Sequence, residues 1–124
     1  MTAAVILDGR AEAVRLLAGV AGGVAQLAAV GKRPCLAAVQ ANRDPGTDWY
    51  ARAQAKHCDA NGIAHRLVKL APDIAQDGLI AELRSLSADP EVSGIILFTP
   101  LPAGCDQLAL ARAIDPAKDA EGIH

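Results

Sequence analysis

The sequence predicts an α/β fold with three layers, in which a mostly parallel, twisted sheet lies between helices. Short apolar segments alternate along the chain with longer segments whose apolar residues recur at helical spacing. Enough residues separate the apolar segments to hold a helix each time, so consecutive strands should run parallel through right-handed βαβ crossovers. The 124 residues are expected to form a single domain, over residues 1–124.

Four short apolar strands are expected, over residues 5–7, 35–41, 63–70 and 94–98. The first of them, Val5-Ile6-Leu7, is closed by a turn at Asp8-Gly9. The last has apolar residues on both faces, which is typical of a central strand in a parallel sheet.

Four helices are expected, at about 10–30, from 47 or 48 to 61, from about 73–77 to 88, and at 106–113. The second should be capped by Thr47 or Asp48, because a short polar side chain there can accept from the free N–H groups of the first turn. Gly31 and Gly62 follow the first two helices as stops, and Pro90 breaks the third.

The composition excludes several classes of protein. The formal charge is −2, and no basic stripe offers the footprint of a nucleic-acid binder. The three cysteines are an odd number without a CxxC pair, which favours a reducing compartment and no zinc site. No signal peptide and no uninterrupted apolar stretch of ~18 residues is recognised, so a cytoplasmic protein without membrane contact is expected.

A binding site is expected where two unusual segments follow strands, at residues 42–50 and 98–102. Ligands in open parallel sheets bind beyond the carboxyl ends of the strands. Tyr50 and Gln54 lie one turn apart and should project from the same face of their helix. The chain has only three aromatic residues, and their position at element ends indicates a pocket for a flat ligand. The prolines of Pro100-Leu101-Pro102 would give that pocket a rigid wall.

Four motifs of the chain resemble, in order and spacing, those of the amino-terminal catalytic domain of bifunctional methylenetetrahydrofolate dehydrogenase/cyclohydrolase. That family is marked by Asp-Gly-Lys, Ser-x-x-Tyr-x-x-x-Lys, Gln-Leu-Pro-Leu-Pro and Pro-x-Lys-Asp-Val-Asp-Gly-Phe. The counterparts here are Asp8-Gly9-Arg10, Thr47 to Gln54, Phe98 to Pro102, and Pro116 to Ile123. The resemblance covers essentially the whole chain and implies the amino-acid-dehydrogenase-like amino-terminal fold.

The resemblance also implies roles for the site residues. In the family, the tyrosine packs on the folate ring, the lysine exchanges protons beside the one-carbon unit, the glutamine tunes that lysine, and the aspartate hydrogen-bonds the pterin. Tyr50 matches the tyrosine, whereas Gln54, Phe98 and Glu121 replace lysine, glutamine and aspartate. Glutamine has no proton to exchange near neutral pH, and such groups contribute about 10²- to 10⁴-fold in rate. The resemblance therefore places Tyr50 and Gln54 at the catalytic positions of the family, although Gln54 lacks the exchangeable proton of the lysine. It also implies substrate contacts from Tyr50, Phe98, Pro100, Leu101, Pro102 and Glu121.

Family members continue into a Rossmann domain that binds the nicotinamide nucleotide. This chain has no GxGxxG after a strand, because Gly22-Gly23 falls inside a helix, so no NAD(P) site and no metal site are expected in it. A homodimer or a separate nucleotide-binding domain is the implied partner.

Three functions remain open at this stage. One is a divergent enzyme of tetrahydrofolate one-carbon metabolism with weak or lost cyclohydrolase activity. Another is the same scaffold recruited to a different small-molecule reaction, as in specialised metabolism. The third is a non-catalytic binding or assembly module.

Overall fold

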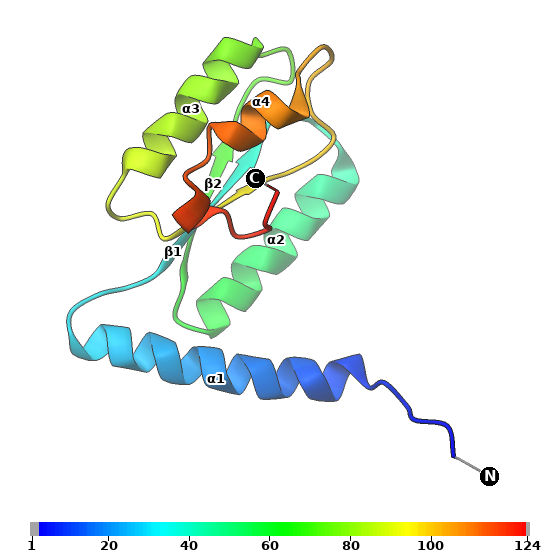
Figure 1. Cartoon of the computed structure of the whole chain (residues 1–124), viewed down its shortest axis with the longest axis vertical. Coiled ribbons are helices and arrows are strands. Elements are labelled where there is room, and N and C mark those ends of the chain that lie inside the picture. The colour runs from blue at the N-terminus through cyan, green and yellow to red at the C-terminus, as the bar shows by residue number, and fades with distance from the viewer. Residues whose placement is uncertain (1–2, 124) are drawn as a thin grey trace.

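Three parallel strands form the centre of the computed structural model, which describes residues 3–123 (Figure 1). They are β1 (Cys35–Gln40), β2 (Ala64–Lys69) and β3 (Gly94–Leu97), in the order β2-β1-β3. Register is fixed by pairs such as Ala37 with Arg66 on one side and with Ile95 on the other. The predicted parallel sheet is therefore present.

β1 and not β3 occupies the centre of the sheet, so the prediction for the last strand is wrong. The apolar faces of β3 have a different cause: helices cover both faces, and the carboxyl-terminal segment covers its free edge. Asp119 bridges to Ile95 in parallel register, and the Ala120 N–H donates to the Ile95 carbonyl at 3.3 Å. The bridged segment follows a short 3₁₀ turn, Pro116–Lys118 (η1).

The sheet lies between two helical layers, as predicted. The helix α2 (Pro45–Ala60) packs on one face, where the buried set consists of Ala38, Ala51, Ile96 and Phe98. The helices α3 (Gln76–Ala88) and α4 (Gln107–Arg112) cover the other face, where the larger core includes Leu79, Leu83, Ile95 and Leu110. Alternate residues of β1 and β3 serve the two faces because successive side chains of a strand point to opposite sides.

The helix α2 begins one turn earlier than expected, because its cap is Asp44 and not Thr47 or Asp48. The Asp44 carboxylate accepts from the backbone N–H of Thr47 at 2.9 Å, and Pro45 occupies the first helical position. Proline is tolerated there because that N–H has no partner within the helix. The cap brings the Asp44 carboxylate and the first turn of α2 to the carboxyl edge of the sheet.

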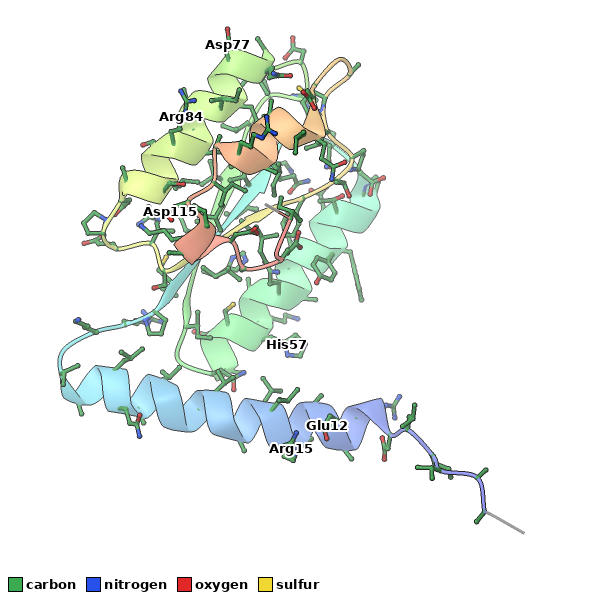
Figure 2. All side chains as sticks on the ribbon, in the orientation of Figure 1. Glu12, Arg15, His57, Asp77, Arg84 and Asp115 are labelled. Carbon is green, nitrogen blue, oxygen red and sulfur yellow. The ribbon has the colours of Figure 1, made fainter. Side chains whose placement is uncertain are left out.

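The helix α1 (Gly9–Ala29) confirms the first predicted helix, but it has no buried residue. It lies apart from the sheet, below the far end of α2 (Figure 1), where Val24 closely approaches Gly62. Glu12 and Arg15 form an ion pair on its surface (Figure 2). By length and composition alone α1 is long and apolar enough to cross a membrane. This is weak evidence, because core helices of soluble proteins and signal sequences meet the same criterion.

The strand predicted at Val5-Ile6-Leu7 is wrong. These residues belong to no helix or strand, and all three side chains are exposed. A strand needs a neighbour to satisfy its backbone N–H and C=O groups, and none of the described strands lies beside this segment.

Candidate functional site

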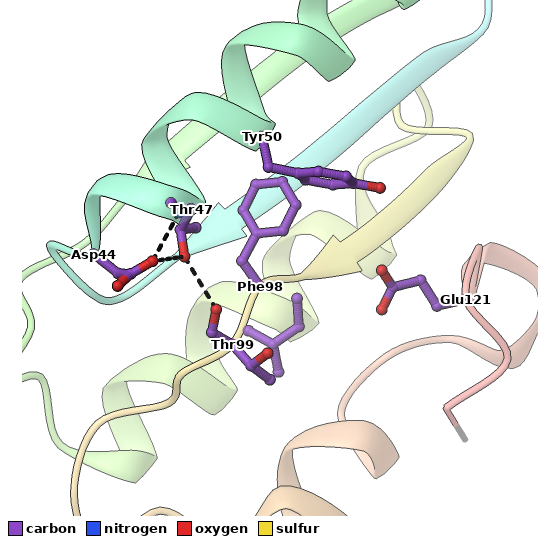
Figure 3. Close-up of a pocket in the computed structure, with 8 residues that line it drawn as sticks. Asp44, Thr47, Tyr50, Phe98, Thr99 and Glu121 are labelled. Atoms are coloured by element: carbon purple, nitrogen blue, oxygen red, sulfur yellow. Dashed lines mark hydrogen bonds between the residues drawn. The ribbon is translucent and has the colours of Figure 1, made fainter.

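A cavity of about 350 Å³ opens at the carboxyl edge of the sheet, between the start of α2 and the end of β3 (Figure 3). The helix α2 and the loop before it supply one wall, β3 and the loop after it supply a second, and the carboxyl-terminal segment supplies a third. The lining residues are Asp44, Gly46, Thr47, Tyr50, Leu97, Phe98, Thr99 and Glu121. Two segments singled out in the sequence therefore meet here.

Tyr50 and Phe98 form an aromatic corner of this cavity. Their ring centroids lie 5.8 Å apart, and the ring planes meet at 86°, an edge-to-face arrangement (Figure 3). Phe98 is only 6% exposed and belongs to the core under α2, whereas Tyr50 is 53% exposed. Phe98 is thus fixed by packing, while the Tyr50 ring keeps a surface that a flat ligand can cover.

Two side-chain hydrogen bonds tie the walls of the cavity together. The Asn42 amide donates to the Pro100 carbonyl at 3.0 Å. The Thr47 hydroxyl lies 3.1 Å from the Thr99 carbonyl and 3.2 Å from the Asp44 carboxylate, and it can donate to one of them at a time. The start of α2 is therefore held against the loop that follows β3.

Glu121 reaches the cavity because its neighbours Asp119 and Ala120 continue along the edge of β3. Its carboxylate points toward the aromatic corner (Figure 3). Burial raises the pKa of Glu121, and the nearby Asp119 charge raises that pKa further. The group is a hydrogen-bond acceptor for a ligand when ionised and a proton donor below its raised pKa.

Gln54 does not line this cavity. Its side-chain oxygen lies 2.9 Å from Nε2 of His65 on β2, and burial lowers the pKa of His65, so the imidazole is neutral near pH 7. Tyr50 and Gln54 are one turn apart and share a helix face by spacing, but the contact with His65 directs the end of the Gln54 side chain away from the cavity. The expected place of Gln54 in the lining is therefore not observed, and the catalytic role of position 54 stays a prediction.

The Pro100-Leu101-Pro102 segment also lies outside the lining of the cavity. Leu101 packs against the core under α3 and α4, Pro102 is buried, and Pro100 is exposed with its carbonyl bound to Asn42. The loop contributes Thr99 instead. Substrate contacts from these three residues remain a prediction.

A polar network at the adjoining strand end supports the start of α2. Gln40, fully buried at the end of β1, donates from its amide to the Asp48 carboxylate at 2.8 Å. Lys69, at the end of β2, donates to the same oxygen at 3.1 Å. These hydrogen bonds, first from Gln40 and then from Lys69, lower the pKa of Asp48. The network fixes α2 relative to both strands.

This network predicts an acid dependence of stability. The folded pKa of Asp48 lies below its ordinary value of 3.8, so the ionised form stabilises the fold above that value. The contribution should decline as the pH falls from 3.8 and vanish below the folded pKa. Urea unfolding of the wild type and of Asp48→Asn across acidic pH should show a gap in free energy that closes as the pH falls. A gap that stays constant would contradict the assignment.

Sequence reasoning missed Asp44, Gly46, Thr47, Leu97 and Thr99 as lining residues. The loop at 42–50 was recognised as a whole, but its individual roles were not. A signal for Asp44 was present, because an aspartate directly before a proline is a typical pairing of N-cap and first helical position. Thr99 lines the cavity because of the path of the loop after β3, and no pattern in the neighbouring residues predicts that path.

The lining of this cavity does not suit a dinucleotide. The backbone N–H of Thr47 at the start of α2 is already bound by the Asp44 carboxylate, and this negative charge stands where a pyrophosphate would bind a helix N-terminus. Glu121 adds a second carboxylate. No group of three or more His, Cys, Asp or Glu side chains able to hold a metal ion is found within residues 3–123.

The fold and the cavity define an α/β ligand-binding domain whose site lies at the carboxyl edge of a parallel sheet. The family model for the tetrahydrofolate dehydrogenase/cyclohydrolase catalytic domain matches residues 7–121, and the chain belongs to that family. The resemblance predicted from the sequence is thereby confirmed, and the structure confirms the predicted α/β fold.

Similar proteins include the bifunctional protein FolD 2 of Frankia alni, 44% identical over 97% of this chain. The bifunctional protein FolD of Nitrobacter winogradskyi is 42% identical over 98% of the chain. The chain spans 42% of the length of each of these relatives. Whatever the rest of those proteins contributes lies outside the part that this chain matches.

Solved structures agree with this assignment. The crystal structure of the FolD dehydrogenase/cyclohydrolase of Campylobacter jejuni superposes with a TM-score of 0.93 at 29% identity, covering 98% of this chain and 43% of that one. The Trypanosoma brucei enzyme, solved with NADP cofactor and an inhibitor, gives 0.84 at 30% identity, with 98% and 41% covered.

Proposed function

We propose that this chain binds a reduced folate in the cavity at the carboxyl edge of the sheet. It would act as the folate-binding domain, over residues 1–124, of a methylenetetrahydrofolate dehydrogenase/cyclohydrolase type of enzyme. The observation that carries the proposal is that Tyr50, Phe98 and Glu121, three residues at family motif positions, line one cavity. The ring of Tyr50 would stack on the pterin, and the Glu121 carboxylate would accept from its N–H groups.

The cyclohydrolase activity of this chain is proposed to be weak or lost. Hydrolysis of the one-carbon bridge needs a group that exchanges protons beside it, and position 54 supplies an amide whose oxygen is directed to His65. The lining carboxylate Glu121 has a raised pKa, but it sits on the wall opposite α2. We thus propose that this chain retains folate binding and has little or no cyclohydrolase activity.

The nicotinamide step would depend on a separate nucleotide-binding domain or on another chain, because the lining of the cavity does not suit a dinucleotide. We propose a cytoplasmic protein with no nucleic-acid or membrane partner, and a homodimer as the alternative assembly. Recruitment to unrelated chemistry is not favoured, because the family match extends over residues 7–121.

Loss of the Tyr50 ring should weaken tetrahydrofolate binding. Titration calorimetry on Tyr50→Ala should show a rise in Kd of roughly 5- to 150-fold, since a stacked ring contributes about 1–3 kcal/mol. Tyr50→Phe keeps the ring and should bind normally. Trp49→Ala is the matched control, because Trp49 is 66% exposed on the same helix turn and does not line the cavity.

An absence of saturable tetrahydrofolate binding by the wild type would overturn the proposal. Equal weakening by Tyr50→Ala and Trp49→Ala would place the ligand elsewhere on α2. Circular dichroism of each variant establishes that the fold is retained.

A further inference from the structure

The two edges of the sheet differ in how they are covered. At the β3 edge, Asp119 bridges to Ile95 and the Ala120 N–H donates to the Ile95 carbonyl, so the chain covers that strand itself. At the opposite edge, no segment of the described chain pairs with the outer side of β2. An edge strand with unpaired backbone groups is a template for pairing with another strand. The outer edge of β2 is therefore a surface that a second strand can cover.

Three residues of β2 turn their backbone groups away from the sheet. The Ala64 N–H donates to the Pro34 carbonyl at 2.8 Å, toward β1. The Leu70 N–H, directly after β2, donates to the Gln40 carbonyl at 2.8 Å. Because backbone groups alternate between the two sides of a strand, the even-numbered residues bond to β1 and the odd-numbered ones point outward. The outward set is His65, Leu67 and Lys69. Within residues 3–123, no hydrogen bond engages their backbone groups.

Leu67 gives this edge an apolar side chain. It pairs in register with Ala38, which belongs to the buried set under α2, so both side chains lie on the α2 face of the sheet. Ala38 is fully buried, whereas Leu67 at the outer strand is 44% exposed. A strand added beside β2 would cover the Leu67 side chain as well as the free backbone groups.

The cationic side chains of β2 do not block this edge. Charged residues on an edge strand commonly prevent pairing with another chain. Here the Lys69 amine lies 3.1 Å from the Asp48 carboxylate, and the Arg66 guanidinium lies 2.8 Å from the Asp89 carboxylate. Burial lowers the pKa of His65, so its ring is neutral near pH 7. The positive charges along the strand are therefore offset within the same chain.

We propose that the outer edge of β2 pairs antiparallel with β2 of a second copy, which joins the two sheets into one. The twofold axis passes beside Leu67 and perpendicular to the sheet, so Leu67 lies opposite its own counterpart. His65 then lies opposite Lys69 of the partner subunit. In this register every outward residue faces an outward residue, and each such pair can exchange two hydrogen bonds. The same surface serves both copies, as in other closed dimers.

An alternative register fits the same edge less well. Placing Arg66 opposite its own counterpart would bring two guanidinium groups together, and like charges directly opposite each other are unfavourable. It would also place Lys69 opposite Ile63, whose N–H already donates to the Cys58 carbonyl at 2.9 Å. The register centred on Leu67 has neither defect, because it places an apolar side chain at the axis and uses every free backbone group of the strand.

The cavity at the carboxyl edge stays open in this arrangement. Antiparallel β2 strands direct the carboxyl edges of the two sheets to opposite ends of the pair, so the two cavities lie far from the axis and from each other. The inference therefore goes beyond the proposed function and does not depend on what the cavity binds.

Sedimentation equilibrium of the whole chain tests the inference. The wild type should dimerise, and Leu67→Lys should raise the dimer Kd about a hundredfold, because two like charges then face each other at the axis. Leu108→Lys is the matched control, since Leu108 is 54% exposed on α4, and it should leave Kd unchanged. Circular dichroism of each variant establishes that the fold is retained. A wild type that is monomeric at roughly millimolar concentration would overturn the inference.

Mixing two variants tests the register. Neither Leu67→Lys nor Leu67→Glu should dimerise alone, whereas an equimolar mixture should form a heterodimer, because opposite charges then face each other across the axis. A mixture that stays monomeric would refute the register centred on Leu67. A dimer that survives Leu67→Lys but is lost in Val14→Lys, at a side chain 70% exposed on α1, would place the contact on α1 and overturn the inference.

Discussion

Gln54→Lys combined with Phe98→Gln is expected to raise hydrolysis of 5,10-methenyltetrahydrofolate by about a hundredfold over the wild type. The gain is the lower part of the range for a positioned general acid or base, about 10²- to 10⁴-fold. A lysine is longer than the glutamine it replaces and starts one turn from Tyr50 on α2, so its amine can reach the cavity. The neutral His65 ring does not repel that amine, because burial lowers the pKa of His65.

The measurement follows loss of the methenyl absorbance at fixed enzyme concentration. Gln54→Met with Phe98→Gln is the matched control, because methionine has similar length and no exchangeable proton, and it should show no gain. A lysine variant that binds folate normally but gives no gain would show that position 54 does not act on the one-carbon bridge.

Leu79→Ala should lower the free energy of unfolding by about 2–5 kcal/mol. Leu79 is fully buried between α3 and the sheet, and truncation removes buried apolar surface and leaves a cavity in a closely packed core. A domain of this size is stable by roughly 5–15 kcal/mol, so the variant could be largely unfolded at elevated temperature.

Urea unfolding followed by circular dichroism gives the change in midpoint. Leu108→Ala is the control, since Leu108 is exposed on α4 and its truncation should change stability by no more than about 0.5 kcal/mol. Equal effects of the two substitutions would contradict the placement of Leu79 in the core.

The sequence predicted the bounds of the helices and of the three paired strands well and the neighbours of the strands poorly. β1 is a short continuous apolar run and α3 carries apolar residues at helical spacing, and both patterns can be recognised without knowing how the elements pack. Val5-Ile6-Leu7 has the composition of a strand, but no described strand pairs with it. Which segments of a chain pair with one another cannot be recognised from a few consecutive residues. The free edge of β3 is covered by Asp119 and Ala120, which come much later in the sequence, so the apolar faces of β3 alone did not reveal its place in the sheet.

The candidate site was predictable where it depends on topology and unpredictable where it depends on side-chain direction. Parallel strands bring residues 42–50 and 98–102 to one edge, so the meeting of Tyr50 with Phe98 could be expected. The direction of Gln54 could not, because it is set by a hydrogen bond to His65 on a strand that follows later in the chain. The cap at Asp44 was readable from the proline after it, and the choice of Thr47 or Asp48 overlooked that pairing.

The bonds from Asn42 to Pro100 and from Thr47 toward Thr99 have a kinetic consequence. They fix the backbone on both sides of the opening before any ligand arrives, so little loop ordering has to accompany association. Association rates of related ligands should therefore be similar, and differences in affinity should appear as differences in residence time. Asn42→Ala, which releases one of these ties, should slow capture of every ligand to a similar degree.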